Sequence, residues 1–534
     1  MNTRERRRAI VLGLLVLMAL LVGFPASSRA EITRIAIQAA QPYGDFAAGK
    51  YIRLEGEALG VLSPGEAIPD LDKAPRNGAG LVEYRTRVIL LMPESPRNGN
   101  GALVVELPNR GRPISHAFYN SPRSRPILPG SLDEGTGFLE NRGYSVVVVQ
   151  WELGEGIDLP AFTNERGVKR YVEGIGFLAA RDTAMFLRYD TSPGNPLAGA
   201  IDRVIAVGYS QTGRYLKTFL ANGFNERGGT VAFDGVHIVG GAAGILPLLG
   251  SGPGPMSVAA RTPDHNDPEL RGVNEEPFTY GDIMKRVGER NRTQPRVIVT
   301  HMQTDYLSSR ASLARTGAIG SVDLPLPQNV RMYDITGAAH LNVRQQNKAC
   351  REPHGQLDWS AALRAQLIAL DEWVRQGTAP PASLLMPLEA RPDPTALPAP
   401  SYLPQARILL PKLAADGNAL GGLRLPDIEV PIATYGNLNS PLTHVACRLV
   451  GTYRPFAKTA ADRQALNDAR PSLQERYPGG INEYTSKVRM AVRKLVAERL
   501  LLEEDGVVIV HAAAENPSFQ PTPPRSRWST GGPR

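Results

Sequence analysis

The stretch Arg203-Val-Ile-Ala-Val-Gly-Tyr-Ser-Gln-Thr-Gly213 decides the fold. Its first half is a short β-branched, apolar run of strand character, and a helix-like segment follows its last glycine. A serine at such a sharp strand-to-helix turn, here Ser210, is the pattern of a nucleophile elbow. Gly208 and Gly213 would let the strand and the helix approach closely. The usual pattern is G-x-S-x-G, and here Thr212 holds its last position. A Gly/Ser turn in an ordinary βα unit is the alternative.

Further short apolar runs have the same strand character. Helix-length segments, such as 177–189, lie between several of them. The runs therefore predict the strands of a mainly parallel sheet with helices on both faces, which is an α/β fold class. The runs are Ala102–Leu107, Ser145–Val149, Val204–Val207, Val236–Val239, Val297–Thr300 and Val330–Ile335.

The sequence around these runs divides into further parts. Residues 31–100 alternate apolar and polar side chains, notably at 50–56 and 82–88, which predicts an N-terminal extension of antiparallel strands. The core itself extends over 101–385. Its Gly/Pro-rich insertion at about 244–295 is too long for a plain connection, so we expect it to form a cap or lid.

The C-terminal part, 386–515, is expected to be an α+β extension. It begins proline-rich and continues with a β-containing segment at 428–435. A capping-box pattern, Ser472-Leu-Gln-Glu475, precedes a final helix at about 484–502. The tail, 516–534, is rich in Pro, Ser, Gly and Arg, a composition typical of disorder.

Residues 1–30 have the three parts of a secretory signal. Arginines at 4 and 6–8 precede an apolar segment at 9–24, and Ser28-Arg-Ala30 is a small-x-small cleavage pattern. The predicted location is therefore periplasmic or extracellular, with no membrane span in the mature chain. An uncleaved N-terminal anchor is the alternative.

Charge and composition exclude several classes of protein. The formal net charge of the chain is +8. Of its 60 basic and 52 acidic groups, five Arg and one Glu lie in the signal segment, which leaves 55 and 51, or +4. This small excess does not indicate a nucleic-acid partner. The sequence has no Walker-type phosphate loop, HExxH pair or CxxC motif, so we expect no metal and no cofactor.

The two cysteines, Cys350 and Cys447, leave two alternatives open. In an oxidising compartment they would form one disulfide between the region after residue 340 and the C-terminal part. Otherwise they are two buried thiols.

Three residues fit a nucleophilic mechanism. A serine hydroxyl is a weak nucleophile at its own pKa, so it needs a base to take its proton and an acid to orient that base. Open α/β sheets place chemistry at the carboxyl ends of their strands. Ser210, Asp305 and His340 each follow such a strand, in the order serine, acid, histidine that α/β hydrolases have. His340 would act first as general base and then as general acid.

Other side chains remain alternatives for these roles. Asp334, at the end of the last apolar run, and Glu152, after the second run, are alternatives for the acid. His301 shares one short loop with Asp305, so it is poorly placed to bridge the acid and the serine. His237 lies inside a strand, which favours a core histidine.

The oxyanion of a tetrahedral intermediate needs two preorganised amides. We expect one from the backbone N–H of Gln211, directly after the nucleophile. The other is expected from the loop after the first apolar run, at Arg110 or Gly111, for which a surface turn is the alternative. Residues near these loops are predicted to line the pocket, although a tryptophan at a strand end is equally often core. They are Asn109, His116, Trp151 and Tyr209.

Several strings of the sequence resemble a bacterial family of secreted or periplasmic proteins, the alpha/beta hydrolase domain-containing proteins. The strings include Asn109-Arg-Gly111, Gly208–Gly213, Gly337-Ala-Ala-His340 and, most specifically, 468–477. This resemblance extends over nearly the whole mature length and implies the α/β-hydrolase fold and serine hydrolase activity, but no substrate. The elbow is also similar to that of glucuronoyl esterases, with Arg214 just after its glycine. Those esterases carry an arginine where this chain has Gln211.

The sequence thus predicts an exported serine esterase acting on a small-molecule or polymer-derived ester. An acyltransferase would use the same residues, with an alcohol in place of water. A non-catalytic binding scaffold on a hydrolase fold is the alternative from a different class.

Overall fold

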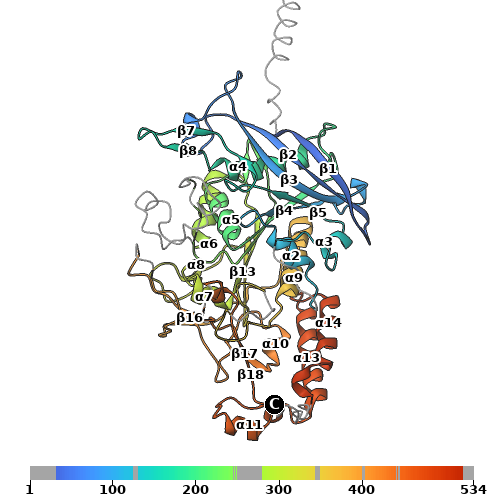
Figure 1. Cartoon of the computed structure of the whole chain (residues 1–534), viewed down its shortest axis with the longest axis vertical. Coiled ribbons are helices and arrows are strands. Elements are labelled where there is room, and N and C mark those ends of the chain that lie inside the picture. Colours follow the sequence, from blue (N-terminus) through green and yellow to red (C-terminus); the bar gives the residue numbers. More distant parts are fainter. Residues whose placement is uncertain are drawn as a thin grey trace, which may run out of the picture.

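One ten-stranded sheet organises the chain (Figure 1). The computed structural model describes residues 32–123, 130–244, 246, 248, 279–342, 349–399, 403–440, 442 and 445–520. The predicted signal, most of the predicted cap and the end of the predicted tail lie outside these ranges. The strand order is β1-β2-β3-β5-β4-β9-β12-β13-β14, with β6 (Ile157–Asp158) paired to β3.

The N-terminal part of the sheet is antiparallel. β1 (Ile32–Phe46), β2 (Gly49–Leu62) and β3 (Val82–Pro93) pair in sequence order, and β3 pairs antiparallel with β5 (Ser145–Val149). Buried and partly exposed residues alternate along most of β2. The prediction of half-exposed antiparallel strands is therefore confirmed for this part of the chain.

The remaining strands are parallel, from β5 through β4 (Ala102–Leu107), β9 (Arg203–Tyr209), β12 (Gly235–Val239), β13 (Arg296–Met302) and β14 (Val330–Ile335). Every residue of β4, β5, β9 and β12 is buried. Strands buried on both faces have apolar side chains at most positions, which explains why nearly continuous apolar runs identified them. All six predicted strands are confirmed.

Helices cover both faces of the sheet. Leu103 and Val105 of β4 share one core cluster with residues of α4 (Ile175–Tyr189), α5 (Gln211–Ala221) and α6 (Tyr280–Arg290). Ala102 and Val104 face the other cluster, with residues of α2 (Ile114–Asn120), α3 (Phe138–Asn141) and α9 (Ser360–Gln376). Successive side chains of a strand point to opposite faces, so one strand supplies both cores. α6, the described end of the predicted cap, packs against α5 and leads directly into β13.

The C-terminal part continues the edge of the sheet. Leu384 and Leu423 form parallel bridges with Tyr333 and Ile335 of β14. The chain then forms α10 (Pro426–Glu429), β17 (Ala433–Tyr435), β18 (Tyr453–Pro455), α13 (Gly480–Ala497) and α14 (Glu503–Ala514). Buried side chains of α10, β17, α13 and α14 belong to the same core cluster as those of α9. In Figure 1, α13 and α14 form a hairpin at one side of the molecule.

Two predictions for this part need correction. The segment 428–435 does contain a strand, at Ala433–Tyr435, and its first residues belong to a short helix that begins at Pro426. The final helix ends at Ala497, and a second helix follows it. The first residues of the predicted disordered tail are ordered, since the Phe519 ring stacks on Tyr484 at 4.8 Å between centroids. The capping box at Ser472 and Glu475 is present.

The remaining elements are short. They are η1 (Leu71–Lys73), η2 (Pro96–Asn98), β7 (Ala161–Thr163), β8 (Lys169–Tyr171), β10 (Glu226–Arg227), β11 (Thr230–Val231), α7 (Gln303–Ser308), α8 (Leu313–Thr316), β15 (Leu388–Glu389), β16 (Leu410–Pro411), η4 (Val445–Leu449), α11 (Ala460–Ala465), α12 (Leu473–Arg476) and η5 (Pro517–Phe519). Within the described ranges, no helix has both the length and the apolar character to cross a membrane.

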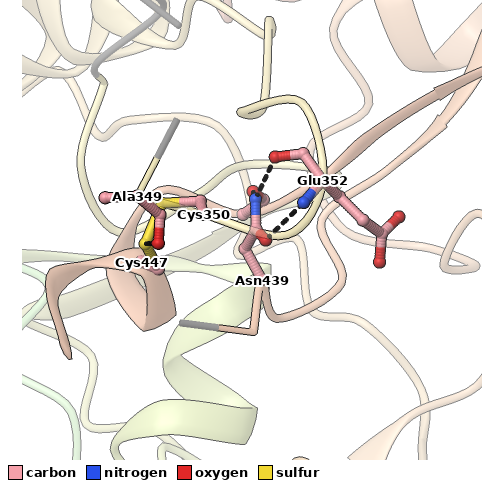
Figure 2. Close-up of a disulfide and its surroundings, with 6 residues drawn as sticks. Ala349, Cys350, Glu352, Asn439 and Cys447 are labelled. Carbon is pink, nitrogen blue, oxygen red and sulfur yellow. Dashed lines mark hydrogen bonds between the residues drawn. A yellow bond between two sulfur atoms is a disulfide. The ribbon is translucent and has the colours of Figure 1, made fainter. Parts of the chain in front are cut away.

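A disulfide joins the C-terminal part to the segment that follows β14. Cys350 and Cys447 are bonded, with their Cα atoms 5.4 Å apart (Figure 2). The sulfur of Cys447 also contacts the Ala349 carbonyl at 3.3 Å, and nearby the Asn439 side chain exchanges two hydrogen bonds with the backbone of Glu352. Of the two alternatives that the sequence left open, the structure has the bonded pair.

Candidate active site

Ser210 lies at the turn between β9 and α5, at the carboxyl end of the parallel sheet. Its φ of 57° and ψ of −109° are a strained combination for a residue with a side chain. The Ser210 N–H donates a 2.7 Å hydrogen bond to the Val239 carbonyl of the neighbouring strand, which holds the turn in place. The backbone therefore has the geometry of a nucleophile elbow.

The displaced glycine of the motif has a structural explanation. A Cβ atom at Gly208 would overlap the Thr212 carbonyl, and one at Gly213 would lie 3.0 Å from the Val239 oxygen. These two positions are therefore the close approaches between strand and helix. Thr212 replaces the usual glycine because its side chain fits inward. Its hydroxyl accepts from the Tyr209 N–H at 2.9 Å and donates to the Tyr209 carbonyl at 3.1 Å.

The structure brings Ser210, His340 and Asp305 together. His340 Nε2 lies 2.9 Å from Ser210 Oγ, and His340 Nδ1 lies 2.6 Å from Asp305 Oδ1. The Asp305 side chain is fully buried, and its second oxygen accepts from the Met302 N–H at 2.9 Å. The carboxylate therefore fixes the tautomer in which Nδ1 carries the proton and Nε2 faces the serine.

Residues from several elements hold His340 in this position. Its backbone N–H donates to Thr304 Oγ1 at 2.7 Å, and its backbone carbonyl accepts from the Tyr209 hydroxyl. The Trp359 indole N–H donates to the preceding Ala339 carbonyl at 2.9 Å. Gly240 has a φ of 61°, and a Cβ there would lie 3.1 Å from the imidazole. These supporting roles are not predictable from the sequence, since they depend on contacts between distant segments.

Asp334 and His301, two of the alternatives, lie together away from Ser210. Asp334 accepts hydrogen bonds from Arg315 at 2.6 Å and from the Tyr306 hydroxyl at 2.8 Å, and His301 Nδ1 lies 3.4 Å away. Burial acts to raise the pKa of Asp334, but the Arg315 charge and the contact with His301 outweigh it, so its pKa is lowered. This aspartate forms a buried ion pair between β14 and α8.

Glu152, the third alternative for the acid, binds Gln211 instead of a histidine. Its Oε1 accepts from Gln211 Nε2 at 3.0 Å, and burial raises its pKa to about 7. Gln211 Oε1 in turn accepts from the Arg110 backbone N–H at 3.1 Å. That amide is therefore engaged by a side chain. The backbone N–H of Gln211 is in the first turn of α5, where amides have no intrahelical acceptor.

The loop after β4 lies beside this turn. Arg110 and Gly111 have φ angles of 51° and 73°. Asn109 Nδ2 donates to the Tyr209 carbonyl at 3.0 Å, and Gln150 Nε2 donates to the Gly111 carbonyl at 3.1 Å. The loop is thus tied to β9 and to the end of β5. With the Arg110 amide engaged, the Gly111 amide is the better placed of the two predicted donors.

The residues predicted to line the pocket are core or support residues. His116 is fully buried 3.1 Å from Glu140, so the structure does not place it at the pocket. The Trp151 indole donates to the Pro108 carbonyl at 2.9 Å and is buried against Tyr215. Tyr209 is buried beside His340 and supports it, and Asn109 is buried as well. His237 bonds to the Tyr119 hydroxyl in the core, as its place in a strand indicated.

The sheet and the serine turn define the class of α/β hydrolases. The chain belongs to the family described as alpha/beta hydrolase domain, whose sequence model matches residues 26–511. The predicted family and fold class are therefore confirmed, and the protein is a hydrolase of this class. No curated protein matches the chain in sequence.

Solved structures similar to this chain include three esterases. A glucuronoyl esterase from Solibacter usitatus is 12% identical, with a TM-score of 0.31, over 58% of this chain and 82% of that one. A putative acetyl xylan esterase from Bacteroides fragilis is 13% identical, with a TM-score of 0.27, over 61% and 74%. The rice cell wall degrading esterase LipA from Xanthomonas oryzae is 12% identical, with a TM-score of 0.27, over 53% and 84%.

Among the described residues, no three His, Cys, Asp or Glu side chains are grouped as a metal site requires.

Proposed function

We propose that this chain is a serine esterase in which Ser210, His340 and Asp305 form the catalytic triad. The observation that carries the proposal is the continuous hydrogen-bonded row of three side chains, 2.9 Å and 2.6 Å apart. A buried carboxylate, an imidazole and a partly exposed serine in this order match the requirements of nucleophilic acyl transfer.

In the proposed reaction, Ser210 Oγ attacks the ester carbonyl while His340 Nε2 takes the serine proton. Asp305 keeps its charge and stabilises the imidazolium that forms. The backbone N–H of Gln211, with that of Gly111, would bind the oxyanion. The imidazolium then gives its proton to the leaving alcohol, which leaves an acyl-serine. A water molecule, deprotonated by His340, hydrolyses the acyl-serine and releases the acid.

Export is a separate proposal. It rests on the signal pattern of residues 1–30 and agrees with a disulfide, because such bonds persist mainly in oxidising compartments. Fractionation of cells that produce the full chain, followed by mass determination of the mature N-terminus, tests it. An intact N-terminus in the membrane fraction would favour the anchored alternative.

A fluorophosphonate probe tests the esterase proposal directly. The purified chain should form one adduct on Ser210, located by mass spectrometry, and should hydrolyse p-nitrophenyl acetate. Ser210→Ala and His340→Ala should abolish both, whereas Ser192→Ala and His511→Ala, matched changes on the surface, should not. Capture of the acyl group by an added alcohol in preference to water would indicate an acyltransferase. A folded chain with neither adduct nor turnover would be a binding scaffold, and the proposal would be wrong.

A further inference from the structure

The unusual charge near the candidate site is Arg214, in the first turn of α5. Its N–H donates to the Ser210 carbonyl at 3.1 Å, so it lies one helical turn beyond the serine. Helical side chains lean toward the N-terminus of their helix. The Arg214 side chain therefore extends back over the turn that carries Ser210.

Arg214 does not serve the helix on which it lies. The N-terminal end of a helix carries partial positive charge, so a cation in the first turn is unfavourable there. The first turn of α5 contains no acidic residue that would offset it. A lysine or arginine kept at such a position needs another reason, and binding an anion from outside the helix is one.

The guanidinium of Arg214 also has no anionic partner in the described part of the chain. Only burial and the like charge of Arg110 affect its pKa, which they lower to about 10, and no hydrogen bond or carboxylate acts in the other direction. Arg214 is partly exposed, so its charge loses part of its hydration, which is costly when no anion is gained in return. A ligand carboxylate would remove that cost.

Arg110, in the loop that contacts Gln211, supplies a second guanidinium. Its backbone N–H lies 3.1 Å from Gln211 Oε1, and its Nη1 donates to the neutral Asn109 amide oxygen at 3.0 Å. The Arg110 charge contributes to lowering the pKa of Arg214, so the two guanidinium groups are close enough to repel. The turn that carries Ser210 is thus bordered by two cations from two elements.

The nearby carboxylates do not neutralise this pair. Glu152 is bound to Gln211 Nε2, and a Cβ at Gly111 would touch the Glu155 carboxylate, which places Glu155 over that glycine. Among the described residues, neither glutamate forms an ion pair with Arg110 or Arg214. The two glutamates lie on the β5 side of the loop, so they make the site asymmetric in charge.

We propose that Arg214, assisted by Arg110, binds a carboxylate group of the substrate, so that the esters hydrolysed are anionic. Half-esters of dicarboxylic acids and esters of hydroxy acids belong to this class. The inference rests on the proposed esterase activity and adds the substrate class to it. Arginine suits this role because its planar fork can bind a carboxylate through two parallel hydrogen bonds.

Two matched pairs of esters test the proposal. Mono-p-nitrophenyl succinate and p-nitrophenyl butyrate differ in a carboxylate on the acyl part. 4-Acetoxybenzoate and its methyl ester differ in a carboxylate on the alcohol part. We expect kcat/KM to be at least about tenfold higher for the anionic member of one pair, as a charged hydrogen bond of about 1.5–3 kcal/mol allows.

The dependence of this preference on Arg214 is the decisive measurement. Arg214→Met should reduce the anionic preference about tenfold or more, and Arg214→Lys should restore part of it. Lys285→Met removes the same charge from the exposed face of the adjacent helix α6 and should leave the ratio unchanged. Circular dichroism of each variant checks its fold.

The outcomes separate the two proposals. Hydrolysis of the neutral esters without preference for either anion, or a preference that persists in Arg214→Met, would overturn the carboxylate site and leave the esterase intact. No turnover of any ester and no fluorophosphonate adduct would instead overturn the esterase proposal.

Discussion

Replacement of single aspartates by asparagine distinguishes Asp305 from Asp334 as the triad acid. Asp305 Oδ1 lies 2.6 Å from His340 Nδ1 in a fully buried site. Asparagine keeps the size of the side chain but removes its charge, and its amide group favours the wrong imidazole tautomer. In a serine protease the same change lowers kcat about 10⁴-fold, or about 5 kcal/mol at 1.36 kcal/mol per tenfold. We expect Asp305→Asn to lose about 10³–10⁴-fold in kcat while staying folded.

Asp334→Asn should lower the stability of the fold and leave kcat nearly unchanged. Among the described residues, the change leaves the buried Arg315 guanidinium with Asp323 as its one carboxylate partner, since Asp334 accepts its other charged hydrogen bond at 2.6 Å. Breaking a buried ion pair costs about 3–5 kcal/mol, so the free energy of unfolding should fall by up to that amount. The kcat of the molecules that remain folded should stay within about threefold of the wild type.

Two assays measure these effects on the same samples. Urea unfolding followed by circular dichroism gives the free energy of unfolding, and p-nitrophenyl acetate hydrolysis in buffer without urea gives kcat. The assignment of the acid would be refuted by an inactive Asp334→Asn chain of wild-type stability alongside an Asp305→Asn chain that turns over normally.

Three further changes test the surroundings of the site. Thr212→Val removes the acceptor of the buried Tyr209 N–H and should lower the free energy of unfolding by about 1–3 kcal/mol; an unchanged urea midpoint would contradict this. The double change Cys350→Ser and Cys447→Ser should cost about 2–4 kcal/mol, because the bond spans 97 residues; wild-type stability that is insensitive to reductant would argue otherwise. Burial raises the pKa of Glu152 from 4.5 to about 7, so the folded chain keeps a proton that the unfolded chain releases, and stability falls as pH rises through this window. Glu152→Gln should remove up to about 3 kcal/mol of that fall. An equal loss of unfolding free energy between pH 5 and pH 8 in the wild type and in Glu152→Gln would exclude this contribution.

The sequence predicted the sheet well because burial and pattern coincide there. Each buried parallel strand has apolar residues at consecutive positions, so the ends of a run such as Ser145–Val149 coincide with the ends of the strand. The strand-turn-helix around Ser210 was also predictable, since Gly208 is required by a contact with Thr212 in the same short segment. Within the β-containing segment 428–435 the strand is limited to Ala433–Tyr435, because Pro426, at the first helical position of α10, begins a short helix just before it.

Side-chain roles at the site were harder to predict, because they depend on partners far away in the sequence. His116 follows the Asn109 loop closely, yet its ring is turned into the core toward Glu140, 24 residues later. Glu152 follows a strand as a catalytic acid does, and its contact with Gln211 distinguishes it. No local pattern carries such information, so the alternatives for the acid stayed open until the contacts were known.

The identity of residue 211 follows from these contacts. The Gln211 side chain is buried, donates to Glu152 at 3.0 Å and accepts from the Arg110 N–H at 3.1 Å. An arginine at this position could donate to Glu152 but has no acceptor for the Arg110 amide. Glutamine alone among the long side chains offers both groups in a neutral form. It therefore links the ends of β4, β5 and β9, and it leaves the positive charge near Ser210 to Arg110 and Arg214.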